Sequence, residues 1–165
     1  MPYPRFSRAR NFKFIVRTAG NYSLNSLNTW ANIDTGLDLT IEAQSGDVLA
    51  AMLCGYVIPS LSNGTTYTNI DACTLVSGSP LGYFGTNTTT QSGQGVPWWT
   101  INGAVAEHGI SGIAHYTVQS ADVVSGAVTV RLRYQTNVAT NQTLRANTNA
   151  PLHWSVRNLG PVQPY

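Results

Sequence analysis

The feature that most constrains the fold of this chain is an alternation of apolar and polar residues with a period of two. In the segment 37–43, Leu37, Leu39 and Ile41 alternate with polar residues, and the segments 128–135 and 152–157 repeat the pattern. Successive side chains of a β-strand point to opposite faces, so this alternation predicts half-buried strands. The best candidate for a helix, the segment 101–116, contains three glycines, each of which destabilises a helix by about 1 kcal/mol relative to alanine.

Weaker strand patterns and turn-forming clusters fill the rest of the chain. Further strands are predicted at 12–18, 28–33, 48–58, 67–76, 95–101, 111–118 and 143–147. Glycine- and serine-rich turns are predicted between them, among others at 45–47, 62–64, 77–80, 91–95 and 125–126. About eight to ten short strands without an internal repeat indicate an all-β sandwich, most simply a jelly roll. We expect an extended arm at 1–11, a single jelly-roll domain at 12–160 and a short tail at 161–165.

The charges are few and unevenly distributed. Only 10% of the residues are charged, whereas about 25% is typical of soluble domains. The first 20 residues carry five basic residues and no acidic one, and the remainder carries four basic and seven acidic residues. No apolar run approaches the roughly 20 residues that span a membrane, and no apolar stretch typical of a secretory signal follows the basic start. We therefore expect no contact with a membrane.

The basic arm interleaves cationic and aromatic side chains. Pro2 and Pro4 favour an extended course. Such a segment suits the phosphates of a nucleic acid, an acidic protein surface with pockets for aromatic anchors, or a frayed end. The candidate docking residues are Tyr3, Arg5, Phe6, Arg8, Arg10 and Lys13.

The segment 48–58 is apolar on both faces of the predicted strand. A strand of this kind must be covered on both sides. The cover is either another part of the chain, such as a long loop or the arm, or a second subunit, because obligate interfaces resemble a cut core. The candidate subunit-contact residues are Leu49, Ala51, Leu53, Tyr56 and Val57.

Residues that carry catalysis or hold metals form no recognisable motif. The acidic residues and the three histidines are scattered, and spacings typical of zinc, calcium, phosphate or nucleophile sites are absent from the sequence. We expect neither an enzyme nor a cofactor. Cys54 and Cys73 could pair or stay reduced. Trp98 and Trp99 could offer an aromatic platform to a sugar or a nucleic-acid base, although packing of at least one of them in the core is the simpler interpretation.

Several segments resemble small jelly-roll proteins of tailed bacteriophages and their prophages. The resemblance covers almost the whole chain, including the Pro-Arg-Phe start, and it rests on NTWANIDTGLDL (28–39), SGDVL (45–49), YTVQSAD (116–122), SGAVTVRLRYQT (125–136) and PLHWSVRNLGP (151–161). Such domains are similar to tumour-necrosis-factor-like and complement-globular-head-like trimers. They serve as capsid decoration proteins or as heads of tail fibres. The resemblance therefore implies a homotrimer on the surface of a virion.

The arm favours the decoration role over the other candidates. We expect a trimer on the capsid exterior whose arms bind the major capsid protein, with no direct contact to nucleic acid. A fibre head normally follows a stalk, and the residues before the first strand show no heptads. The alternative is a tail-fibre head or a receptor- or glycan-binding module that uses Trp98 or Trp99 with the loops 62–68 and 86–95.

Overall fold

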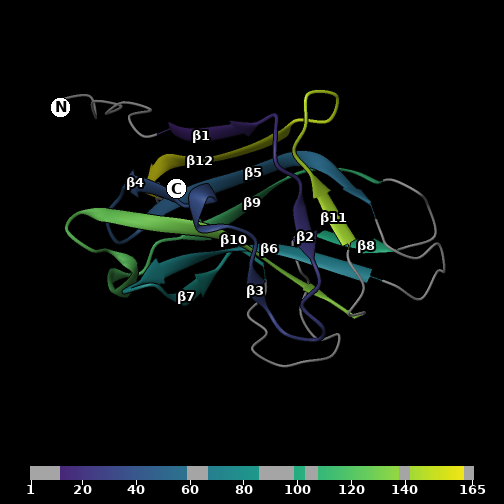
Figure 1. The fold of residues 1–165 in the computed structure, drawn as a ribbon. Helices are drawn as coiled ribbons and strands as arrows, with labels where there is room; N and C mark the ends of the chain where they lie inside the picture. The colour runs from purple at the N-terminus through teal and green to yellow at the C-terminus, as the bar shows by residue number, and fades with distance from the viewer. Residues whose placement is uncertain (1–11, 59–66, 86–98, 103–107, 138–141, 162–165) are drawn as a thin grey trace, which may run out of the picture.

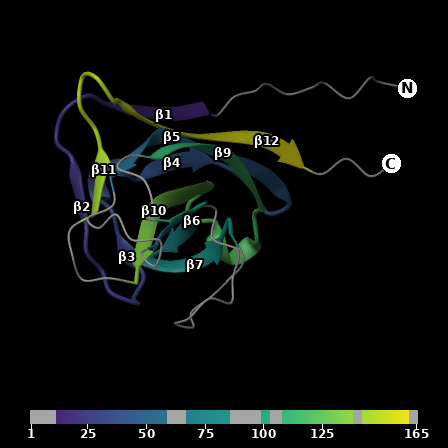
Figure 2. The ribbon, with the colours of Figure 1, turned by 90° about the vertical axis from the view of Figure 1, so that its right-hand side faces the viewer.

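The computed structural model describes residues 12–58, 67–85, 99–102, 108–137 and 142–161, and these form two antiparallel β-sheets. Figures 1 and 2 show the sheets as two stacked layers, with β1, β12 and β5 in one and β10, β6 and β7 in the other. The first sheet contains β1 (Phe12–Arg17), β2 (Tyr22–Leu24), β5 (Asp47–Ile58), β9 (His108–Thr117), β11 (Gln142–Arg145) and β12 (Leu152–Pro161). The second contains β3 (Ala31–Asn32), β4 (Leu39–Glu42), β6 (Tyr67–Val76), β7 (Ser79–Tyr83), β8 (Trp99–Asn102) and β10 (Ala127–Thr136). The prediction of an all-β fold is confirmed.

Strand β5 is central in the first sheet, and strands β6 and β10 are central in the second. In the first sheet, β9 pairs with β5 along almost its whole length, while β12 and β11 pair with the other edge of β5. Strand β1 then pairs with β12, and β2 with β11. In the second sheet, β6 and β10 pair with each other, β3 and β4 follow the outer edge of β10, and β7 and β8 follow the outer edge of β6.

The core lies between the two sheets and is built by the alternation that the sequence displays. Its largest fully buried side chains include Trp154, Leu37, Leu53 and Leu132. The indole Nε1 of Trp154 donates to the carbonyl oxygen of Leu37 at 2.9 Å. This bond fixes the 3₁₀-helix η1 (Thr35–Leu37) against β12, so that the one polar atom of the indole is satisfied inside the core.

Two of the predicted turns are tight two-residue turns. Val76 pairs with Ser79 around Ser77 and Gly78, and Val124 pairs with Ala127 around Ser125 and Gly126. The residue pairs have φ values of 51° and 81° in the first turn, and of 52° and 78° in the second. Positive φ at both central positions is the type I′ geometry, which matches the twist of the flanking strands.

The structure also adds elements that the alternation did not reveal. Strands β2 and β7 were not predicted, and β2 is only three residues long. The segment 101–116, which was the best candidate for a helix, overlaps strand β9 instead. The only helices among the described residues are the 3₁₀-helices η1 and η2 (Ser120–Asp122), and none there is long and apolar enough to cross a membrane.

Both cysteines are free thiols. Cys54 lies on β5 of the first sheet and Cys73 on β6 of the second. The question of a disulfide, which the sequence left open, is thereby answered: the two residues belong to different sheets and do not pair.

Candidate docking site

The two faces of β5 have different fates, and one part of the interface prediction is wrong. Leu49, Ala51, Leu53 and Val57 point into the sandwich and are completely buried within the protomer. They cover the second sheet and have no accessible atoms to offer another subunit. Only Tyr56, among the predicted contact residues, lies on the outer face, where 42% of its surface is exposed.

The outer face of the first sheet carries a continuous row of side chains across four strands. In register, Phe14 of β1 lies opposite Ser155 of β12, Ser155 opposite Met52 of β5, and Met52 opposite Ile113 of β9. Side chains in register on one face of a sheet are near neighbours. Phe14, Met52 and Ile113 are exposed, whereas Ser155 between them is almost fully buried.

Further apolar side chains extend this row into a patch, which we call the docking face. The rings of Phe12 and Phe14 stack with their centroids 5.5 Å apart. A shallow cavity of about 260 Å³ lies over Ser155 and His153, between Phe14, Val16 and Met52. The exposed members of the docking face are between 36% and 63% accessible: Phe12, Phe14, Val16, Met52, Tyr56 and Ile113.

The charges that share the outer face of the first sheet are all positive. Arg157 lies opposite Ala50, and Arg145 opposite Tyr56. His153 and His115 occupy outward positions on β12 and β9. None of the outward positions of these strands, within the described part of the chain, holds an aspartate or a glutamate. The docking face is therefore apolar at its centre and cationic at its margins.

The outer face of the second sheet is organised in the opposite way. Arg133 and Asp71, on neighbouring strands, form an ion pair of 2.7 Å in which both side chains are buried. The Asp71 carboxylate also accepts hydrogen bonds from the backbone N–H groups of Ala72 and Gly85, each at 2.8 Å. Burial raises the pKa of Asp71, while Arg133 and these donors act against that shift.

Aromatic rings complete the environment of this ion pair. The Arg133 guanidinium lies 4.1 Å from the ring centroid of Trp30 and 4.0 Å from that of Tyr83. A cation between two aromatic faces is stabilised by their quadrupoles and shielded from water. The charges of Arg133 and Asp71 are thus satisfied within the chain itself.

One buried hydrogen-bond cluster unites groups that also occur in active sites. The carboxylate of Asp122, fully buried, accepts from the hydroxyls of Thr74 at 2.6 Å and Tyr116 at 2.7 Å, and from the N–H of Gln119 at 2.8 Å. Burial and the neighbouring Asp122 raise the pKa of Tyr116. The Tyr116 hydroxyl therefore stays protonated and donates a hydrogen bond to the Asp122 carboxylate. This bond anchors η2 to the sheet, and we assign the cluster a structural role.

The remaining predicted site residues are only partly covered by the structure. Tyr3, Arg5, Phe6, Arg8, Arg10 and Trp98 lie outside the described residues. Lys13 is exposed and lies within β1, opposite Val156. Trp99 is the first residue of β8, where its backbone pairs with Ile70. Within the described ranges, no group of three His, Cys, Asp or Glu side chains could hold a metal ion.

The sequence reasoning missed most of the docking face. It placed strands at 12–18 and 111–118, but it did not connect Phe14 or Ile113 with residues 48–58, because strand order is not visible in local periodicity. Phe12, Phe14 and Val16 alternate with Lys13, Ile15 and Arg17. The apolar residues on both faces of this segment were the signal in the sequence that could have indicated an exposed apolar face here.

Comparison with known proteins gives no family for this chain. No protein-family model matches it, and no curated protein matches it.

Proposed function

We propose that this protein is a structural component of a virion, namely a homotrimeric capsid decoration protein that binds the major capsid protein through its basic N-terminal arm. The observation that carries the proposal is the docking face, an apolar surface with cationic margins on β1, β5, β9 and β12. An exposed apolar patch of this kind marks an interaction surface. Strand β1, which contributes Phe12 and Phe14, is the strand that directly follows the arm.

The strand pairings support a jelly roll within the sandwich. The pairs β1–β12, β4–β10, β5–β9 and β6–β8 are nested, with each earlier strand paired to a correspondingly later one. Such nesting arises when one long antiparallel hairpin is rolled into two sheets, which is the jelly-roll arrangement. This topology agrees with the tumour-necrosis-factor-like trimers that the sequence resembles.

The charge pattern supports a ring of three over a face-to-face dimer. A two-fold dimer through the docking face would bring its cationic margins together, because such an interface uses the same patch on both subunits. In a closed ring, the docking face of one subunit meets a different surface of the next. The docking face then supplies the subunit contact, and the arms stay available for the capsid.

The subunit contact is tested by a charge placed in the docking face. Ile113→Asp puts an anion on the most central exposed position of β9, where 58% of the side chain is accessible. We expect the wild type to have the mass of a trimer in light scattering after size-exclusion chromatography, and Ile113→Asp to have that of a monomer. The matched control is Leu81→Asp, an exposed position on the second sheet, which should remain trimeric. A monomeric wild type, or a trimeric Ile113→Asp variant, contradicts this contact.

The role of the arm is tested by its removal. Deletion of residues 2–11 should leave a folded trimer that no longer binds virus shells lacking this protein, measured by co-sedimentation. Because every arm in the lattice repeats the same weak contact, avidity multiplies the loss. Normal binding of the truncated trimer to these shells contradicts the docking mechanism.

A receptor-binding head at the tail tip is the second candidate. It is favoured by a partly open cavity on the outer face of the second sheet, which hydroxyl, charged and apolar groups line. Gold-labelled antibodies against the protein in electron micrographs of the virion distinguish the candidates, because decoration predicts labelled heads and a fibre head predicts labelled tail tips.

A further inference from the structure

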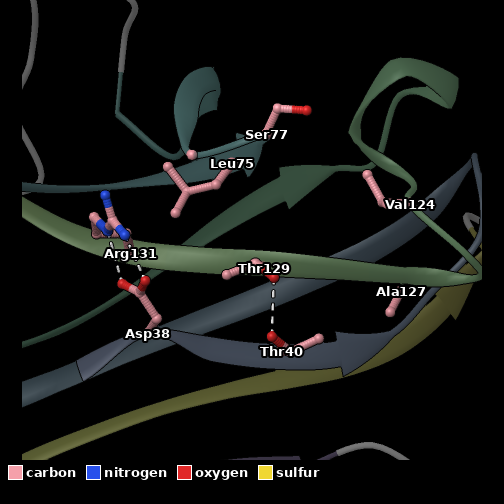
Figure 3. Close-up of a pocket in the computed structure, with 9 residues that line it drawn as sticks. Asp38, Thr40, Leu75, Ser77, Val124, Ala127, Thr129 and Arg131 are labelled. Atoms are coloured by element: carbon pink, nitrogen blue, oxygen red, sulfur yellow. Dashed lines mark hydrogen bonds and ion pairs between the residues drawn. The ribbon is translucent and has the colours of Figure 1, made fainter. Parts of the chain in front are cut away.

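The outer face of the second sheet contains a cavity of about 420 Å³ that the proposed decoration role does not use. This volume lies within the range of roughly 300–1,000 Å³ found for small-molecule sites. Figure 3 shows Asp38, Thr40, Thr129 and Arg131 along the strands β4 and β10, with Leu75 and Ser77 on one side and Val124 near one end. The lining therefore combines charged, hydroxyl and apolar groups.

The charges in the cavity cancel. Arg131 donates from Nε and Nη2 to the two carboxylate oxygens of Asp38, at 2.8 Å and 2.6 Å. This bidentate geometry is the strong form of a carboxylate–guanidinium pair. The hydrogen bonds that Arg131 donates to Asp38 raise the pKa of Arg131, so the guanidinium keeps its proton. A cavity with this balance selects neither an anion nor a cation.

The other polar groups are hydroxyls. Thr40 and Thr129 lie opposite each other on β4 and β10, and their Oγ1 atoms are 2.9 Å apart. A hydroxyl can donate and accept at the same time, so this pair retains hydrogen-bonding capacity toward a third partner. Ser77 adds an exposed hydroxyl residue at the rim.

Apolar surface lies beside these hydroxyls, and the walls are built from tight turns. Leu75 and Val124 line the cavity, but Leu75 is only 6% exposed, so the accessible aliphatic surface comes mainly from Val124, which is 52% exposed. Ser77 and Gly78 belong to one type I′ turn, and Val124 and Ala127 flank the other. Two-residue turns leave the chain little freedom, so the cavity is formed before any ligand arrives.

We propose that this cavity binds an uncharged saccharide ring. The ring hydroxyls would exchange hydrogen bonds with Thr40, Thr129 and the outer lone pairs of Asp38, and the C–H face of the ring would cover Leu75 and Val124. A saccharide is the class of ligand that presents many donor-acceptor hydroxyls and an apolar face on one small ring. The proposal does not depend on the oligomeric state or on the arm.

The test is a titration of the ¹⁵N-labelled full chain with methyl α-D-glucopyranoside, methyl α-D-galactopyranoside and N-acetyl-D-glucosamine, followed by amide NMR spectra. A single ring that fills one open site should bind with a Kd on the order of 1–10 mM. We expect saturable shifts at residues 75–78 and 124–131 for at least one of these sugars. Inorganic phosphate, the anionic control, should cause none there.

The double variant Thr40→Val/Thr129→Val removes both hydroxyls and keeps the branched shape. Because both partners of one hydrogen bond are replaced together, no buried group is left unpaired and the fold should persist. We expect the affinity to fall about tenfold or more, while Thr117→Val, an exposed position on β9, changes nothing. The proposal is overturned by an absence of saturable shifts with all three sugars, by unchanged affinity in the double variant, or by stronger shifts with phosphate.

Discussion

The outer faces of the two sheets differ in the side chains that they present to solvent. Each sheet of a sandwich has one face in the core and one face outside, and strands β5 and β10 are similarly central in their sheets. The second sheet places Arg131 and Arg133 outward and pairs both with carboxylates of its own chain. The first sheet places Met52 and Ile113 outward and leaves them accessible. The second sheet pairs these charges within the protomer, whereas the first sheet leaves apolar side chains exposed at its centre.

The two faces use the few charged residues of this chain differently. On the second sheet, Arg133 and Asp71 are buried against each other and Arg133 lies against two aromatic rings, so this pair defines structure. On the first sheet, arginines lie at the margins of an apolar centre that is exposed. The predictions below test whether the two faces differ in this way.

The largest effect is expected from breaking the buried ion pair. Arg133→Met leaves the Asp71 carboxylate buried without its cation, which should lower the free energy of unfolding by about 3–5 kcal/mol, measured by urea denaturation. Arg157→Met, the matched change on the exposed margin of the docking face, should change it by less than about 0.5 kcal/mol.

Adding the substitution Asp71→Asn to Arg133→Met separates the stability lost with the ion pair from the stability lost with packing. In Arg133→Met/Asp71→Asn the uncompensated charge is gone, so part of the lost stability should return. If the double variant is as unstable as the sum of the two single variants, the pair does not act as a unit.

The pH dependence of stability should contain a component from the buried Cys73 thiol. Burial raises the pKa of Cys73 to about 11 from an ordinary value of 9.0. Between these pH values the unfolded chain releases the thiol proton and the folded chain keeps it, so the stability falls as the pH rises. The loss approaches about 2–3 kcal/mol as the pH rises through 11.

The measurement is urea denaturation at a series of pH values from 8 to 11. Cys73→Ala should lack this component of the loss. An identical pH dependence in wild type and Cys73→Ala would falsify the assignment.

The smallest effect is expected from trimming the docking face in the separated protomer. Met52→Ser, made in the Ile113→Asp background, should change the free energy of unfolding by less than about 1 kcal/mol, because the side chain is already 36% exposed. Leu53→Ala, its neighbour on the core side of β5, should lower it by about 2–5 kcal/mol. Equal losses would mean that both faces of β5 are covered within one chain.

Local patterns in the sequence were sufficient for much of the fold. The alternation at 37–43, 128–135 and 152–157 corresponds to strands β4, β10 and β12. The Ser-Gly pairs at 77–78 and 125–126 correspond to type I′ turns. These features depend on the side chains of a few neighbouring residues, and they can be recognised without knowledge of the rest. Strand β2 escaped prediction because three residues are too few to display a period.

The candidate sites depended on contacts between distant segments. Arg131 and Asp38 are 93 residues apart, and Arg133 and Asp71 are 62 apart. Alternation showed that both arginines point outward, and by itself it indicated a solvated face. Only the pairing of β10 with β4 and β6 brought these partners together, as one buried pair, Arg133–Asp71, and one partly exposed pair, Arg131–Asp38.

The amino-acid sequence by itself determined that this chain is a β-sandwich with a basic start, because strand periodicity and charge are local properties. It also indicated that β5 is apolar on both sides. The tertiary structure decided which of those sides is the core and which is the docking face, because that choice depends on the sheet packed opposite. It also brought Phe14, Met52 and Ile113 into one row, since register between strands is set by packing across the whole sheet.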